Sequence, residues 1–278
     1  MEAAKPNIHF IFIELIAFWE GSINASQVSQ YFSLSRQQAS KYIKSYSAYY
    51  PQNLVYNANL KGFETSPLFI KQQISADVCE YLNWLDTQNI KPKTNDLKAH
   101  THTALNIPDR QVSPLVMRSL ITAMRKGMRV DVDYISLTNA SKEGRVIQPV
   151  IFVKTGLRWH LRAFDEKHQQ YRDFVLSRFR GEPELLGKSH QQKIQDHSWE
   201  TKIDLVFEPD NRLSDNQKIV VEQDYQMQNS RLVINTRAAL AQYVLLSKGS
   251  ESLIFQQNIS KLLRILKSSI KHNLNVHL

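Results

Sequence analysis

The chain has 278 residues, 42% of them hydrophobic, which is enough for two or three domains of ordinary size. Lys and Arg (35) outnumber Asp and Glu (26), and the formal net charge of +9 favours a polyanionic partner without identifying it. The single cysteine, Cys79, excludes an internal disulfide framework and a cysteine-rich zinc site, and indicates a cytoplasmic location. The apolar N-terminal stretch is interrupted by Glu14, and no stretch approaches the ~20 apolar residues of a membrane span. We therefore expect neither a signal peptide nor a membrane partner.

The first 50 residues have the pattern of a helix-turn-helix. Residues 8–20 carry apolar side chains at the spacing of one helical face, which predicts a core helix. Asn24 can cap a following helix and Gln27 can reach back to it, so a short helix is expected through Phe32. After a tight turn, Ser35 repeats this capping pattern and opens a second helix. Two short helices joined in this way behind a longer one are typical of the motif.

The second of these helices has an outward face of residue types that hydrogen-bond base edges and phosphates. No acidic residue occurs from Gly21 through Gly62. Residues 53–64 predict a hairpin in the position of a wing. The candidate DNA-binding residues on this helix and hairpin are Ser35, Arg36, Gln37, Gln38, Ser40, Lys41, Lys44, Asn59 and Lys61. The alternative is a small helical bundle with a polar surface helix, and the hairpin is the feature that favours a winged helix over it.

A connection between domains is expected after a further amphipathic helix at residues 74–85. Residues 87–111 are polar and contain two prolines. His100 and His102 lie in this stretch, but without a nearby Cys, Asp or Glu cluster they make a poor metal site. We predict no metal site and no cofactor for the chain.

From Met128 onward the hydrophobic period changes from that of a helix to that of strands. A helix at residues 114–126 precedes strand patterns at 128–136, 145–153, 157–164 and 171–177. Short strands at this spacing indicate a small antiparallel barrel or a curled sheet. Asp131 and Asp133 share their strand face with no His and are expected to be solvated rather than metal ligands. The chain has no Gly-rich phosphate loop, nucleophile elbow or H-E-x-x-H helix, and we assign no catalytic residue.

The strand at residues 158–164 alternates between apolar residues and donors. Arg158, His160 and Arg162 fall on one face, with Trp159 and Leu161 on the other. Two cations beside an imidazole are costly unless an anionic or acceptor-rich group lies against them. That group is either a ligand or the Asp and Glu side chains of a solvated strand face, and this segment alone does not decide between them.

The last part of the chain alternates strand-like runs with helices, which is an α+β pattern. Strands are expected at 201–208, 218–222 and 232–235, and helices at 238–246 and 260–272. The final helix has a basic stripe, for which a solvated outer face is the default explanation. Its members are Lys261, Arg264, Lys267 and Lys271.

The middle of the chain resembles the WYL domain, which is named for a Trp-Tyr-Leu tripeptide. The resemblance is carried by Tyr134 with Ser136, Arg145 with Pro149, the tripeptide at 159–161 and the run at 172–178. His160 replaces the middle Tyr of the tripeptide. With a winged helix before it and an α+β extension after it, the whole chain resembles the WYL transcriptional regulators, most closely the branch that controls bacterial anti-phage defence operons of the BREX and CBASS type.

This resemblance implies a multidomain α+β protein with an Sm-like or SH3-like small β-barrel in its centre. We divide the chain into a winged helix-turn-helix (1–90), a linker (91–112), a WYL domain with its leading helix (113–196) and a C-terminal dimerisation domain (197–278). The resemblance further implies a homodimer that represses transcription from an inverted-repeat operator. A nucleotide or nucleic-acid effector is expected at the barrel face that carries Tyr134, Ser136, Arg145, His160, Arg162 and Arg178. Alternatively, Arg145 and Arg178 pair with barrel carboxylates such as Asp173 and serve only structure.

Three functional hypotheses follow from these patterns. The leading one is a dimeric DNA-binding repressor whose operator affinity changes when a ligand binds the WYL domain. The second is a nucleic-acid-processing enzyme such as a nuclease, which needs a convergent carboxylate or His site that the sequence does not offer. The third is an adaptor that binds nucleotide signals without contacting DNA. Retained operator binding would exclude the adaptor.

Overall fold

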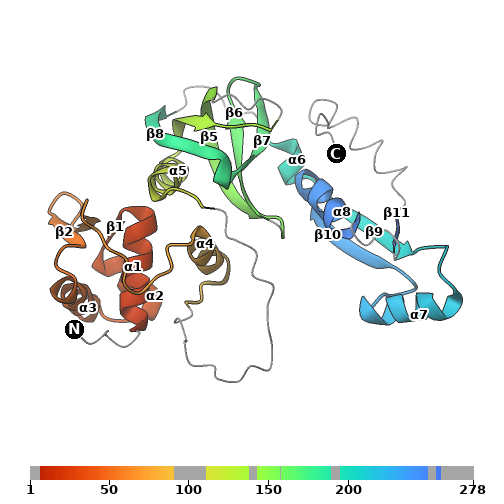
Figure 1. The fold of residues 1–278 in the computed structure, drawn as a ribbon, viewed down its shortest axis with the longest axis horizontal. Coiled ribbons are helices and arrows are strands. Elements are labelled where there is room, and N and C mark those ends of the chain that lie inside the picture. The colour runs from red at the N-terminus through yellow and green to blue at the C-terminus, as the bar shows by residue number, and fades with distance from the viewer. Residues whose placement is uncertain are drawn as a thin grey trace. The chain divides into compact units, whose positions relative to one another are not determined.

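The structure is a computed structural model that describes residues 7–90, 111–137, 143–156, 158–188, 195–249 and 255–257 (Figure 1). The chain forms two compact units. The first comprises residues 1–153 and 158–191, and the second comprises residues 154–157 and 192–278. Most of the expected linker at 91–112 and the whole basic helix at 260–272 lie outside the described residues.

The first unit begins with the helix-turn-helix and wing that the sequence predicts. Its helices are α1 (Ile8–Glu20), α2 (Ala25–Phe32), α3 (Arg36–Tyr49) and, after the wing, α4 (Val78–Thr87). Asn24 and Gln27 form the predicted capping box at the start of α2, and Ser33 takes a left-handed conformation (φ 53°) in the turn before α3. The helix predicted at 74–85 begins instead at Val78, because Asp77 caps it by accepting from the Cys79 amide.

The wing is a three-stranded sheet rather than a hairpin alone. Strands β2 (Leu54–Asn57) and β3 (Gly62–Thr65) pair as predicted, and a two-residue strand β1 (Ser22–Ile23) adds to β3 in the order β1-β3-β2. Sequence patterns missed β1 because two residues carry no periodicity. The strand ties the wing to the segment between α1 and α2.

Helix α1 is the centre of this domain. Residues Phe10 through Ala17 and Trp19 are all buried, because α2, α3, α4 and the wing pack around the helix. Helix α5 (Pro114–Lys126) also packs on α1 and, on its other side, on strands β4 and β8 of the next domain. One hydrophobic core therefore runs from the helix-turn-helix into the central sheet.

The central sheet has five antiparallel strands in the order β7-β6-β5-β4-β8. They are β4 (Met128–Tyr134), β5 (Glu143–Lys154), β6 (Trp159–Asp165), β7 (Gln170–Val175) and β8 (Phe179–Lys188), with the 3-10 turn η1 (Leu176–Arg178) before β8. β7 and β8 are the two edges, so the described strands form an open sheet and no closed barrel. Strand β8 was not predicted, because exposed residues dominate it and its apolar period is weak.

The second unit is a small α+β domain. Its strands β9 (Lys202–Pro209), β10 (Leu232–Arg237) and β11 (Phe255–Gln257) pair in the order β10-β9-β11. Its helical segments are α6 (His197–Glu200), α7 (Asp215–Asp224), η2 (Ala238–Leu240) and α8 (Ala241–Gly249). Its core is centred on Leu205, Phe207, Val221 and Ala241.

The prediction of a strand at residues 218–222 is wrong, since this segment lies inside α7. Ser214 and Gln217 form a capping box that starts the helix, and Val221 is its one buried residue. The apolar run Ile219, Val220 and Val221 has high β-propensity, but local capping and packing on β9 decide the outcome.

Candidate functional site

The N-terminal half of α3 presents a polar, basic surface. Its inner residues Ala39, Ile43 and Tyr46 are at most 1% exposed, as their spacing predicted. The opposite face carries the candidate DNA-binding side chains, of which Arg36, Gln37, Lys41 and Lys44 are exposed and Gln38 and Ser40 are half-buried. The side chains are therefore placed as a groove-binding helix would need them.

Ser35 has a structural role in this surface. Its Oγ accepts a hydrogen bond from the Gln38 amide at 3.1 Å, which satisfies one of the free N–H groups at the start of α3. The hydroxyl fixes where the helix begins, and so where Arg36 and Gln37 are displayed.

The tip of the wing brings Asn59 and Lys61 to the surface. The Asn57 side chain accepts from the backbone amides of Asn59 (2.9 Å) and Leu60 (3.3 Å), which holds the turn between β2 and β3. Asn59 and Lys61 are exposed, and Lys61 closes the turn in a left-handed conformation (φ 47°). The wing therefore carries an amide and a cation at its far end, as the sequence predicted.

Beneath α3 lies a buried carboxylate, Glu14, which sequence patterns did not predict as a functional residue. Glu14 is fully buried in α1, where its Oε1 accepts from the three backbone amides of residues 72–74 and its Oε2 accepts from the Tyr46 hydroxyl at 2.9 Å. Asn53, at the base of the wing, donates to the same hydroxyl at 2.8 Å. Burial raises the pKa of Glu14, although the four hydrogen bonds to its carboxylate oppose that change. This network connects α3 to the segment that follows the wing.

The donor-rich strand face is buried. His160 (3% exposed) and Arg162 (5%) lie inside the central sheet, and both faces of β6 are covered. One acceptor for these donors is a carboxylate of the chain itself, since Arg162 Nη1 lies 2.8 Å from Asp173 Oδ1 on β7. The Arg162 guanidinium also lies 5.9 Å from the centre of the Tyr171 ring.

A second buried ion pair lies on the neighbouring strand. Arg145 Nη1 is 3.1 Å from Asp165 Oδ2, and His168 Nδ1 is 2.7 Å from the same oxygen. The Arg145 guanidinium is 5.9 Å from the ring centre of Tyr134, whose hydroxyl accepts from the Val175 amide at 3.1 Å. Arg145 pairs with a carboxylate of its own domain, although with Asp165 and not with Asp173.

Ser136 and Arg178 complete the predicted sensor set and are half-buried. The Arg178 carbonyl accepts from the Ile135 amide at 3.1 Å, so η1 lies beside the end of β4. Tyr134, Arg145, His160 and Arg162 thus lie on the neighbouring strands β4, β5 and β6, whereas Ser136 follows β4 and Arg178 lies in η1. Arg145 and Arg162 are held in ion pairs, whereas Arg178 makes no ion pair among the described residues.

Among the described residues, no helix is long and apolar enough to cross a bilayer. No group of three or more His, Cys, Asp or Glu side chains is placed to hold a metal ion in that part of the chain.

Three family models match the chain in order. Residues 6–87 match the winged helix-turn-helix domain of the BrxR transcriptional regulator, residues 116–181 match the WYL domain, and residues 202–249 match the C-terminal dimerization domain of the BrxR regulator. Together they account for well over half of the chain.

Several curated relatives are similar over most of their length. DNA-binding transcriptional repressors named CapW from Pseudomonas aeruginosa and from Escherichia coli strain KTE188 are 27% and 28% identical over 84% of this chain and 79% of their own. A CapW from Stenotrophomonas maltophilia is 26% identical over 87% of this chain and 82% of its own. Among solved structures, proteasome accessory factor B/C of Arthrobacter aurescens matches with a TM-score of 0.27 and 14% identity, over 95% of this chain and 48% of that one.

The fold and the matched domains define a winged helix-turn-helix protein with a WYL domain and a C-terminal dimerization domain. Within that class, the chain belongs to the WYL-domain transcriptional regulators, and both of its terminal domains are of the BrxR type.

Proposed function

We propose that the chain is a homodimeric repressor that binds an inverted-repeat operator of a phage-defence operon. The observation that carries this proposal is the surface of α3, where Arg36, Gln37, Lys41 and Lys44 are exposed and no acidic residue lies anywhere from Gly21 to Gly62. Such a surface attracts phosphates and has side chains that can reach base edges. The relatives named as DNA-binding transcriptional repressors support the same function, and no catalytic step is part of it.

We propose a separate role for each of the domains that the sequence predicts. Residues 1–90 bind DNA through Ser35, Arg36, Gln37, Gln38, Ser40, Lys41, Lys44, Asn59 and Lys61. Residues 91–112 connect this domain to the WYL domain at 113–196, and residues 197–278 form the dimer. A two-fold dimer presents two α3 helices, which is the arrangement that an inverted repeat matches.

The DNA-binding assignment is tested with two double variants. Wild-type protein first selects duplexes from a library of genomic fragments. Arg36→Ala with Lys41→Ala should then weaken binding to the selected duplex at least about tenfold, and should make the slope of log K against log salt shallower by about one to two. Lys188→Ala with Lys202→Ala is the matched control, since both lysines are exposed and lie outside the winged helix. Equal binding by both double variants, or no duplex selected by wild type, would contradict the assignment.

The second part of the proposal is that a nucleotide or nucleic-acid effector binds the WYL sheet at Tyr134, Ser136, Arg145, His160, Arg162 and Arg178, in an Sm-like or SH3-like arrangement. Arg178 would make the first phosphate contact because it is partly exposed and has no carboxylate partner among the described residues. A phosphate could then compete with Asp173 for Arg162, since both are anions that accept from the same guanidinium. The effector changes repression only if the DNA-bound and free forms differ in affinity for it.

Calorimetric titration with a panel of mononucleotides and short oligonucleotides tests the effector site. Arg178→Ala should weaken the binding of any ligand found at least about tenfold, whereas the exposed Lys188→Ala should not change it. Binding that Arg178→Ala leaves intact would place the ligand elsewhere.

A further inference from the structure

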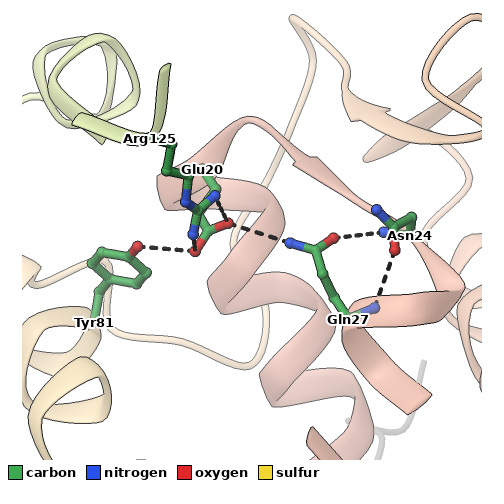
Figure 2. Close-up of polar contacts among 5 residues, drawn as sticks. All are labelled: Glu20, Asn24, Gln27, Tyr81 and Arg125. Atoms are coloured by element: carbon green, nitrogen blue, oxygen red, sulfur yellow. Dashed lines mark hydrogen bonds and ion pairs between the residues drawn. The ribbon is translucent and has the colours of Figure 1, made fainter. Parts of the chain in front are cut away.

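Glu20, the last residue of α1, joins three helices. Its side chain is 3% exposed, and it forms a bidentate ion pair with Arg125 of α5 through Nη1 (2.6 Å) and Nη2 (2.8 Å). The Tyr81 hydroxyl of α4 donates to it at 2.9 Å, and the Gln27 side-chain amide of α2 donates at 3.3 Å. Figure 2 shows these residues converging on the carboxylate, and we call them the Glu20 cluster.

Every acceptor position of the Glu20 carboxylate is occupied by a donor of this cluster. Oε1 accepts from Arg125 and Tyr81, and Oε2 accepts from Arg125 and Gln27. An ionised carboxyl group has about four acceptor positions, and all of them are taken here. Because the group is buried, loss of any donor leaves part of a charge without a partner. Glu20 is therefore satisfied only while α2, α4 and α5 are all in place.

The cluster continues into the start of the helix-turn-helix. The Gln27 Nε2 group faces Glu20, which leaves its Oε1 free to accept from the Asn24 backbone amide at 2.9 Å. The Asn24 side chain in turn accepts from the Gln27 amide at 3.0 Å, completing the capping box (Figure 2). Helix α2 has eight residues, of which only Val28 is fully buried while Tyr31 and Phe32 pack more loosely on the core, so its cap contributes to holding this short helix.

A second contact from α5 reaches the same segment. The Arg118 Nε donates to the Phe18 carbonyl at 2.9 Å, and its side chain lies against Gly21, where a Cβ would be 3.3 Å from the Arg118 Cδ. The Gly21 carbonyl accepts from the amide and the hydroxyl of Thr65, at the base of the wing. Helix α5 therefore holds the short segment to which both α2 and the wing are attached.

We propose that Glu20 is a positioning residue that transmits the placement of α5, the leading helix of the WYL domain, to the cap of α2. Arg125 holds Glu20 in the orientation that Gln27 needs, and Gln27 closes the cap from which α2 and α3 follow. A change in the central sheet that moves α5 loosens the helix-turn-helix through this contact. The link itself is a property of the fold, and its effect on operator binding rests on the proposed function.

The test is hydrogen exchange in the full-length protein, with Arg125→Gln as the perturbing variant. Because Arg125 is 55% exposed, this substitution removes the ion pair without opening the core. We expect the amides of α2 to exchange about fivefold faster, the effect of losing one helix cap. Arg129→Gln is the matched control, since Arg129 makes an equivalent bidentate pair with Glu166 (2.7 and 2.7 Å) inside the WYL domain. It should leave α2 unchanged.

A double-variant cycle shows whether the effect passes through Gln27. Gln27→Ala should speed exchange in α2 by itself, and adding Arg125→Gln should produce little further change. Unchanged exchange in Arg125→Gln, or fully additive effects, would overturn the proposal. Arg125→Gln should also weaken binding to the selected duplex, whereas Arg129→Gln should not. If wild type binds no duplex, the proposed function fails while the exchange data still decide the role of Glu20.

Discussion

Glu14 offers the sharpest test of what holds the recognition helix in place. Glu14→Gln keeps a carbonyl oxygen for the three backbone amides of residues 72–74 but replaces the oxygen facing Tyr46 with an NH₂ group. The Tyr46 hydroxyl already accepts from Asn53, so after the substitution its O–H has no acceptor. A buried donor without a partner costs about 1–3 kcal/mol.

We expect Glu14→Gln to destabilise the winged helix domain by about 2 kcal/mol, or roughly a 30-fold faster exchange of the α1 amides. Glu14→Ala removes the acceptor of four donors and should cost at least about 4 kcal/mol. Native-state hydrogen exchange in the full-length chain follows the opening of the α1 amides themselves. Glu64→Gln is the control, because Glu64 lies half-buried on the wing strand β3 and makes no side-chain hydrogen bond to any residue that the structure describes.

Protection of α1 that is equal to or above wild type in Glu14→Gln would refute this reasoning. It would mean that relief from burying a charge outweighs the lost hydrogen bond. Both effects act on the pKa of Glu14, since burial raises it and the weaker influence of the backbone and Tyr46 hydrogen bonds lowers it.

Three further predictions concern stability and DNA binding. Burial lowers the pKa of His9 below its ordinary value of 6.5, so the contribution of His9 to stability is complete above pH 6.5 and is lost as the pH falls through the pKa of the folded state. The melting temperature should therefore fall less between pH 7.5 and pH 5.5 in His9→Phe than in wild type. Gly62→Ala places a Cβ 2.9 Å from the Ile23 carbonyl oxygen, so the wing must shift and binding to the selected duplex should weaken. Normal affinity would contradict the idea that binding needs the wing in this position. Arg162→Ala removes the 2.8 Å ion pair to Asp173, whose side chain is 7% exposed, and should lower the free energy of unfolding in urea by about 3–5 kcal/mol, part of which Asp173→Ala should restore.

The sequence predicted features that depend on neighbouring residues. The capping box of Asn24 and Gln27 and the cap at Ser35 join groups three residues apart, so they can be read from spacing alone. The buried faces of α1 and α3 follow from helical periodicity in the same way. These local signals were enough for the winged helix, which the family model confirms.

The contacts that were missed join residues far apart in the chain. Glu14 binds amides 58 to 60 residues later, and Glu20 pairs with Arg125 across 105 residues. The residues that flank each glutamate in the sequence do not identify its partner. The donor-rich strand was interpreted correctly as needing acceptors, but which carboxylate faces Arg162 depends on the register of β6 and β7, where Arg162 is directly opposite Asp173. Pairing register was not available from one sequence.

Both missed carboxylates lie on α1, and their spacing defines what this helix does. Glu14 and Glu20 are six residues apart, about 9 Å along the axis, and the first holds Tyr46 of α3 while the second holds Arg125 of α5. Each is buried and saturated by donors, so neither contact can lengthen gradually without leaving charge unsolvated. If α5 is displaced, either the ion pair between Arg125 and Glu20 breaks, or α1 moves with α5 as a rigid body and α3 moves with it. Both outcomes change how α3 is presented, and the effector that we propose for the WYL domain would need such a difference between two states to alter operator affinity.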